Sequence, residues 1–289
     1  MNVFNWLNKL TNAFFDSIDT ITTKLLILVL SCITIPLIVV GNFSSNIIND
    51  GIIQNLQRIL DINQKILEKR YADEIAEIGS SVKIAVSDIG AEEIILGAQS
   101  KKFINYLTKK NNDKLSFLAV IDANKSVKEF WGNINRNEVL NKLTRPINIV
   151  MGGESLQFTE SVANDVFQIS ITPLYSKDKL LGIVLAGKSL KNSVIASYIN
   201  NITGNTVIVY KFDNTRAEII SASGNWRAQS NFINVNNIDD SKQEGFYFKN
   251  NILHNDSDFL QNITINNLFN EPVAKIYLGM PKYDAIVWV

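Results

Sequence analysis

Four side chains in the middle of the sequence have the chemistry to recognise a small molecule: Trp131, Arg145, Asp165 and Tyr175. A guanidinium can clamp a carboxylate through two parallel hydrogen bonds, so Arg145 is the candidate contact for an anionic group. The carboxylate of Asp165 would pair with an ammonium group, and the rings of Trp131 and Tyr175 would stack on it. These residues predict a ligand-binding site.

Each of the four also has a purely structural interpretation. Arg145 precedes a proline and would then be a solvated surface side chain. Asp165 follows Asn164 and would then be a turn residue. Trp131 and Tyr175 would then pack in a hydrophobic core.

The sequence offers no catalytic constellation, metal site or cofactor site. With one His and one Cys, a Cys-based or His-rich metal site is excluded, and nothing points to a base poised beside a nucleophile. Residues 254–258 carry oxygen and nitrogen ligands but lack the Gly and the distant Glu of a calcium loop. Residues 152–154 lack the Lys-Ser/Thr of a nucleotide-binding loop. We therefore expect a protein that is not an enzyme and that holds no cofactor or metal.

The charge balance excludes nucleic acid as a partner. Lys and Arg together number 28, as do Asp and Glu, so the formal net charge is zero. Binding to a phosphate backbone needs a basic excess that this chain lacks. A hydrophobic fraction of 46% with 19% charged residues predicts a folded chain.

Residues 25–43, LLILVLSCITIPLIVVGNF, form an apolar run with no further charge until Asp50. Its length is close to the ~20 apolar residues that cross a bilayer, so we expect a transmembrane helix there. Residues 1–24 have helical amphipathic spacing and would be a cytoplasmic leader on the inner leaflet. The alternative is a cleaved signal peptide, since Val39 and Gly41 would suit a cleavage site.

The orientation follows from the few flanking charges. Lys9 and Lys24 precede the apolar run and Arg58 is the nearest positive charge after it, which favours an amino terminus inside. The single Cys, Cys32, would lie in the bilayer, and an exported part without Cys suits a bacterial periplasm. We expect a single-pass protein of the bacterial inner membrane with most of its chain in the periplasm.

Residues 44–100 are predicted to form a long stem helix and a connection. Apolar residues recur every three or four positions from Ile48 to Ile89, with one slip between Ile66 and Tyr71. Such a helix packs along a globular domain, pairs with a second copy, or does both. We expect both, and hence a homodimer.

Beyond the stem, the pattern predicts two modules, 101–190 and 191–282, each with short strands joined by turns. Landmarks such as the turns at Asp122 and Asp213 recur at offsets of 91, 94 and 92 residues, which indicates an internal duplication. Alternating apolar and polar residues over 166–173 predict a half-buried strand. Ser189 and Gly204 are the expected ends of a helix between the modules.

The order and spacing of these elements resemble the double Cache sensor domain of bacterial histidine kinases, nucleotide cyclases and chemoreceptors. The phrases that carry the resemblance are FLAVIDANKSVKEF, ISITPLYSKDKLLGIVLAGKSL, ITGNTVIVYKFDNTRAEIISASGNW and VAKIYLGMP. The resemblance implies an α+β fold in which each PAS-like module has a central antiparallel sheet. It also implies a small ligand in the membrane-distal module, 101–190, and a dimer through the stem. The ligand class cannot be carried over, because the amino-acid-binding signature of one Cache subclass is missing.

Family members continue into a second membrane helix and an output domain, and residues 283–289 resemble the start of such a helix. We therefore expect the ligand-sensing part of a membrane-anchored signal-transduction receptor, with its output domain missing or supplied by a partner. The alternative is an exported, membrane-tethered binding or assembly module without a signalling output.

Overall fold

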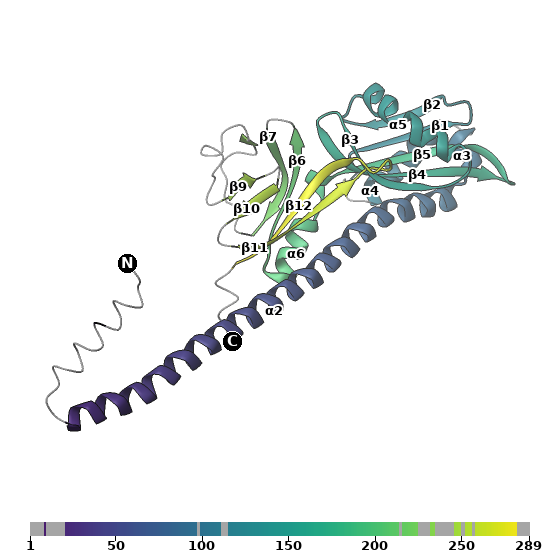
Figure 1. Cartoon of the computed structure of the whole chain (residues 1–289). Helices are drawn as coiled ribbons and strands as arrows, with labels where there is room; N and C mark the ends of the chain where they lie inside the picture. Colours follow the sequence, from purple (N-terminus) through teal and green to yellow (C-terminus); the bar gives the residue numbers. More distant parts are fainter. Residues whose placement is uncertain are drawn as a thin grey trace. The chain divides into compact units, whose positions relative to one another are not determined.

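The computed structural model describes residues 9, 21–96, 99–110, 115–213, 216–224, 232–234, 246–249, 252–255 and 258–281. Most of the predicted leader and the predicted terminal segment 283–289 lie outside the described residues. The fold class is α+β, with two antiparallel sheets and one long helix, as the sequence predicts (Figure 1). The chain divides into two compact units, residues 1–56 and residues 57–289.

The first unit contains the beginning of helix α2 (Ile21–Ile89), which has 69 residues. Most of its apolar side chains from Leu25 to Val40 are exposed, and that of Leu37, for example, is 67% exposed. Among the described residues, no helix combines the length and the apolarity that crossing a membrane requires. The transmembrane helix predicted over 25–43 is not confirmed.

The second unit begins with the rest of α2, residues 57–89, which we call the stem. Its buried side chains Leu60, Leu67 and Glu74 are seven residues apart and so lie on one helix face. The stem ends where Gly90 adopts a φ of 92°, a conformation that side-chain-bearing residues rarely adopt. Two short helices follow, α3 (Ala91–Ile95) and α4 (Ser100–Lys110).

The first sheet has five antiparallel strands in the order β2-β1-β5-β4-β3. Their bounds are β1 (Phe117–Asp122), β2 (Val127–Gly132), β3 (Leu156–Val162), β4 (Asp165–Ser176) and β5 (Lys179–Ser189). One face packs on the stem, α3 and α4 through an apolar cluster, and the other face packs on α5 (Arg136–Val150). Helix α5 buries Leu143, Ile147 and Val150 against the sheet.

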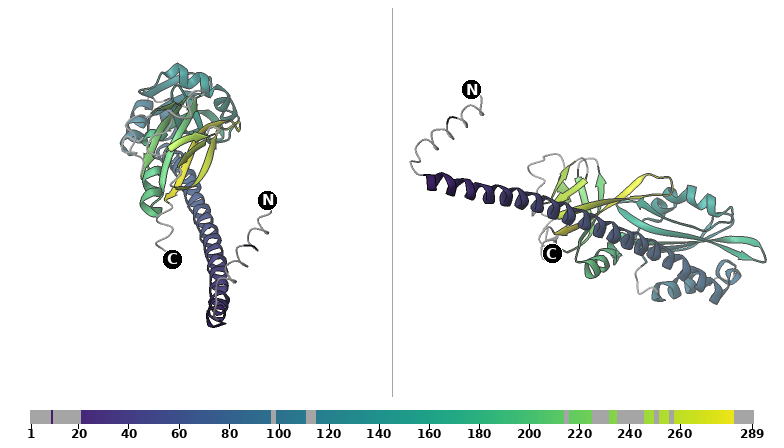
Figure 2. Two further views of the ribbon diagram at one scale, coloured as in Figure 1. Left: turned by 60° about the vertical axis from the view of Figure 1, so that its left-hand side comes forward. Right: turned by 60° about the horizontal axis from the view of Figure 1, so that its bottom comes forward.

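The second sheet has the order β11-β12-β6-β7-β8. Its strands are β6 (Thr206–Asp213), β7 (Arg216–Ser223), β8 (Phe232–Asn234), β11 (Asp258–Asn266) and β12 (Pro272–Pro281). A separate hairpin, β9 (Phe246–Lys249) and β10 (Ile252–Asn255), places Leu253 against this sheet. The stem covers the opposite face, so one helix runs along both sheets (Figure 2).

The helix predicted between the modules is split into a 3₁₀ turn, η1 (Leu190–Asn192), and α6 (Ile195–Thr203). Ser189 caps the 3₁₀ turn, accepting a hydrogen bond from the Lys191 amide at 3.0 Å. Gly204 ends α6 in the left-handed conformation, as predicted.

The two sheets repeat one design. The order β2-β1-β5-β4 in the first sheet corresponds to β7-β6-β12-β11 in the second. Each first hairpin has a register shift at the equivalent place, after Val120 in β1 and after Val209 in β6. These positions are 89 residues apart (209 minus 120), which agrees with the duplication that the sequence indicates.

Candidate functional site

Two of the four predicted residues, Trp131 and Asp165, line one cavity of about 540 Å³. It lies at the end of the first sheet where β2 ends, β4 begins and β5 runs into η1, and we call it the first-sheet cavity. Apolar side chains of Leu115, Ile134 and Phe167 form part of its wall. The sequence therefore brings an indole and a carboxylate together, as the ligand-site prediction requires.

The carboxylate of Asp165 is held in a fixed orientation. The Ser189 hydroxyl donates a hydrogen bond to Oδ2 at 2.6 Å, and the Val166 amide donates to Oδ1 at 2.8 Å. Ser189 is itself positioned by its amide, which donates to Ser116 Oγ at 2.9 Å. An ionised carboxylate has about four lone-pair sites, so about two of them stay open to a ligand.

Asp165 is held there by a tight turn. Ala163, between β3 and β4, adopts a φ of 53°, which reverses the chain within two residues. Asp165 is the first residue of β4 and directly follows this turn, and its place after the turn does not exclude the ligand interpretation.

A cation that the sequence analysis did not select also lines this cavity. Lys191, in η1, lies in the wall, and its Nζ is 3.3 Å from Glu218 Oε1 on β7. Its side chain is 46% exposed, so this ion pair is at the surface and weak.

Arg145 and Tyr175 are not part of the first-sheet cavity. The Arg145 guanidinium lies 4.0 Å from the centre of the Phe269 ring, in the turn between β11 and β12. Tyr175 is at the far end of β4, about 30 Å along the strand from Asp165, and its hydroxyl donates to the Gly153 carbonyl at 3.0 Å. The structure does not bring these two residues to a common site with Trp131 and Asp165, because their side chains hold turns instead.

A buried polar group links the stem to the first sheet, and sequence analysis missed it. Lys188 of β5 and Glu74 of the stem form an ion pair, with exposed side-chain fractions of 6% and 1%. The Ser193 hydroxyl donates to the second carboxylate oxygen of Glu74 at 2.9 Å. The only signal in the sequence is that Glu74 follows Leu60 and Leu67 at the same seven-residue spacing.

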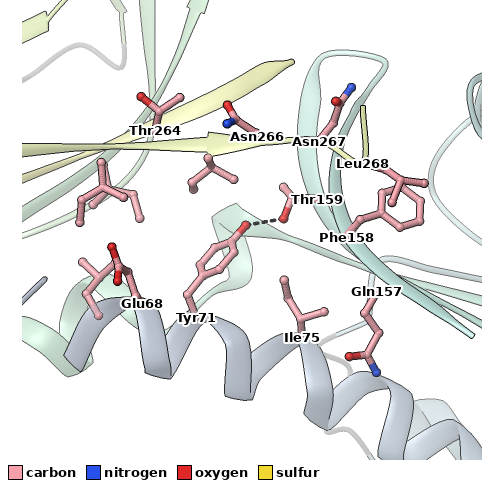
Figure 3. Close-up of a pocket in the computed structure, with 14 residues that line it drawn as sticks. Glu68, Tyr71, Ile75, Gln157, Phe158, Thr159, Thr264, Asn266, Asn267 and Leu268 are labelled. Atoms are coloured by element: carbon pink, nitrogen blue, oxygen red, sulfur yellow. Dashed lines mark hydrogen bonds between the residues drawn. The ribbon is translucent and has the colours of Figure 1, made fainter. Parts of the chain in front are cut away.

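A second cavity of about 520 Å³ lies between the stem, β3 of the first sheet and β11 and β12 of the second (Figure 3). We call it the junction cavity. The hydroxyls of Tyr71 and Thr159 are hydrogen-bonded to each other in its wall at 2.5 Å. Burial raises the pKa of Tyr71 well above its usual range, so this hydroxyl stays neutral.

No protein-family profile matches the chain, and no curated protein matches it in sequence. Similar solved structures include an extracellular ligand binding receptor from Desulfohalobium retbaense DSM5692, at 13% identity and a TM-score of 0.39. That match covers 74% of this chain and 39% of the other, so the chain spans about two fifths of the receptor's length.

The match to two further similar structures covers almost the whole length of each of them. One is the extracellular domain of vpHK1S-Z8, described as a histidine kinase, at 11% identity and a TM-score of 0.47, covering 82% of this chain and 98% of that one. Another is the sensory domain of the Campylobacter jejuni chemoreceptor Tlp3 with isoleucine bound, at 12% identity and a TM-score of 0.43, covering 83% and 96%. They are sensor domains rather than catalytic domains. The similar solved structures of histidine kinases and chemoreceptors are Cache-type sensor domains, the family that the sequence resembles.

Proposed function

We propose that this chain is an extracytoplasmic ligand-sensing module and that the first-sheet cavity binds a small molecule carrying a positively charged amine. The observation that supports the proposal is the carboxylate of Asp165, fixed by two hydrogen bonds in a cavity that also holds an indole. A carboxylate and an aromatic face are the two groups that recognise an ammonium ion most strongly. Lys191 would meet a carboxylate on the same ligand, so free amino acids are the first probes.

The cavity is connected to the stem by a short chain of contacts. Ser189, which holds Asp165, is adjacent to Lys188, which pairs with Glu74 of the stem. A ligand that binds the carboxylate of Asp165 would change its hydrogen bond with Ser189 at the end of β5. This would shift the neighbouring Lys188. The proposed signal is a shift between two arrangements of the stem, which requires that the ligand binds one of them more tightly.

The test is thermal unfolding of the full chain with each common amino acid and with simple primary amines. We expect at least one probe to raise Tm in a saturable way, because a ligand that binds only the folded state stabilises it. Asp165→Asn keeps the shape and the hydrogen-bond acceptor but should abolish the shift. Arg145→Ala is the matched control and should leave it unchanged. A panel without any shift, or a shift that survives Asp165→Asn, would overturn the proposal.

We propose further that the chain is tethered to a bacterial inner membrane through residues 25–43, with the second unit in the periplasm. The exposed apolar side chains from Leu25 to Val40 support this, since water is a poor solvent for such a run. Alkaline carbonate extraction of bacterial membranes tests it. The chain should stay in the pellet, and a variant with two Lys residues in place of Leu30 and Ile33 should be released.

We propose that two copies pair through the stem. Ile59 and Ile62 of the stem are 44% and 49% exposed, and Ile202 of α6 is 55% exposed. Apolar side chains left uncovered on one helix are the usual contacts of a paired helix. Light scattering of the full chain should give a dimer, and Ile62→Glu should give a monomer if the stem is the interface.

A further inference from the structure

The junction cavity is built from the stem, β3 and the hairpin of β11 and β12, which are far apart in the sequence. The stem contributes Leu67 and Tyr71, β3 contributes Thr159, and the turn between β11 and β12 contributes Asn267 (Figure 3). A molecule bound there would touch the stem and both sheets at once. None of the four residues selected from the sequence lines it.

The polar groups of this cavity are hydroxyls and amides, with one charged exception. Among the described residues that line it there is no Lys, Arg or Asp, and the one charged side chain is Glu68. Glu68 is exposed and accepts a hydrogen bond from Gln64 at 2.6 Å. This differs from the first-sheet cavity, which holds both Asp165 and Lys191. An ion buried in the junction cavity would have no counter-charge in its interior, and burying an unpaired ion is costly.

The hydrogen bond between Tyr71 and Thr159 leaves one donor unused. Each hydroxyl has one proton and can accept two hydrogen bonds, and either of the two can be the donor in their mutual contact. Whichever hydroxyl donates, the proton of the other remains for a third group, which can be the Gln168 amide beside Tyr71 or a ligand. Because burial keeps Tyr71 protonated, this donor is present at every physiological pH.

Unsatisfied polar groups lie next to this pair. Gln168, opposite Thr159 in the register of β3 and β4, is fully buried, and neither polar atom of its amide makes a hydrogen bond of normal geometry. The buried hydroxyl of Ser170 is also unpaired, and Ser170 and Gln157 lie close to Gly79, where the stem has no side chain. Gln168 and Ser170 both lie on β4, opposite the lining residues Thr159 and Gln157 of β3, and do not line the cavity themselves, so the polar surroundings of the cavity extend beyond its wall.

We propose that the junction cavity is a second ligand site, for a small uncharged molecule rich in hydroxyl or amide groups. Its volume of about 520 Å³ lies within the range of small-molecule pockets. The apolar side chains of Leu67, Ile75 and Ile276 would contact the carbon skeleton. The hydroxyls of Tyr71 and Thr159 would contact its polar groups. This site does not depend on the proposed function of the first-sheet cavity.

The experiment is calorimetric titration of the full chain with neutral probes: D-glucose, D-ribose, glycerol and propionamide. We expect saturable binding of at least one. Thr159→Val keeps the shape of the side chain but removes a hydroxyl, and it should weaken that probe about tenfold, as the loss of one hydrogen bond does. Asp165→Asn is the control and should not change the affinity.

A second variant tests the cavity independently in case Thr159→Val does not fold. Thr264 is exposed on β11 at the cavity wall, so Thr264→Trp should fold normally and its indole should obstruct the cavity. Binding of a neutral probe should be lost in this variant. The proposal is overturned if no neutral probe binds, or if binding survives both Thr159→Val and Thr264→Trp. It is also overturned if binding is lost in Asp165→Asn, because the probe would then occupy the first-sheet cavity.

Discussion

The two sheets share a strand order and a stem-facing core, but different segments cover their other faces. Helix α5 covers the first sheet with aliphatic side chains, and on the sheet face beneath it the rings of Phe117 and Phe167 meet edge to face at 5.4 Å. The hairpin of β9 and β10 contributes Leu253 to the second sheet, over the buried rings of Tyr210 and Tyr277. The order of four strands is thus the same in both modules, and the segment that packs on the other face of the sheet differs between them.

The two modules also differ in how they use an aspartate at the start of an equivalent strand, Asp165 of β4 and Asp258 of β11. In the first module, Asp165 at the sheet's end keeps open hydrogen-bonding capacity in a cavity. In the second module, Asp258 accepts a hydrogen bond from the Tyr277 hydroxyl at 2.8 Å inside the core. The first module uses its acidic residue at a cavity wall, whereas the second uses a comparable residue to satisfy a buried phenol.

The largest effect should come from the contact that only the first sheet makes with the stem. Glu74→Ala would leave Lys188 buried without its counter-charge, and the free energy of unfolding should fall by about 3 to 5 kcal/mol. Replacing both residues, as in Glu74→Leu with Lys188→Met, should restore most of the loss. Urea unfolding measures both variants, and a double variant as unstable as the single one would contradict the account.

Helix α5 and the hairpin of β9 and β10, which cover the two sheets, can be compared by truncating one buried leucine in each. Leu143 of α5 and Leu253 of β10 are both fully buried. Leu143→Ala should cost about 2 to 5 kcal/mol, because a rigid helix closes poorly over the cavity left behind. Leu253→Ala should cost less, since its cluster is smaller. Equal losses in urea unfolding would show that the hairpin covers its sheet as tightly as the helix does.

The buried phenols predict an alkaline limit to stability, to which the second sheet contributes Tyr210 and Tyr277 and the stem contributes Tyr71. Burial first, and then the charge of Asp258, raises the pKa of Tyr277 far above its usual range, and burial raises the pKa of Tyr210 to about 12. Both groups lose their protons more readily in the unfolded chain, whose tyrosines titrate near pH ~10. Their contribution is therefore complete below pH ~10 and is lost as the pH rises above it. Urea unfolding from pH 8 to 11 should show this decline, and Tyr277→Phe should make it shallower.

The smallest effect concerns Arg145, which lies over Phe269 between the two modules. An exposed cation–π contact contributes about 0.5 to 1 kcal/mol, so Arg145→Ala should lower the free energy of unfolding by no more than this. Arg145→Lys should retain part of it. A loss of several kcal/mol would mean that the contact holds the modules together far more strongly than its exposure suggests.

The periodicity of apolar residues predicted several helices and strands. It could not predict which residues from distant parts of the sequence contact each other. The stem, the first hairpin of each sheet and the cap at Gly204 follow from local spacing. The alternation over 166–173 predicted a half-buried strand, but 166–172 are all buried, because the stem covers the polar side. The pairing of Glu74 with Lys188, 114 residues away, leaves no local signal.

Two of the four residues selected from the sequence line the first-sheet cavity, and the other two make their contacts elsewhere. Trp131 is near the end of β2 and Asp165 is at the start of β4, so both lie at the same end of the first sheet, and a correct order of strands places them near each other. Arg145 was chosen for its chemistry, but its contact depends on a turn in the other module. The residues of the junction cavity come from the stem, β3 and the hairpin of β11 and β12, and only the assembled fold brings them together.

Hydrogen–deuterium exchange of the full chain, with and without the amine that raises Tm most, measures whether a ligand in the first-sheet cavity changes the stem. The account predicts slower exchange in residues 163–167 and 189–192, around the first-sheet cavity, and in stem residues 70–78, with no change in residues 206–213 of the second sheet. Protection confined to the second sheet, or a bound amine that leaves the stem unchanged, would contradict it.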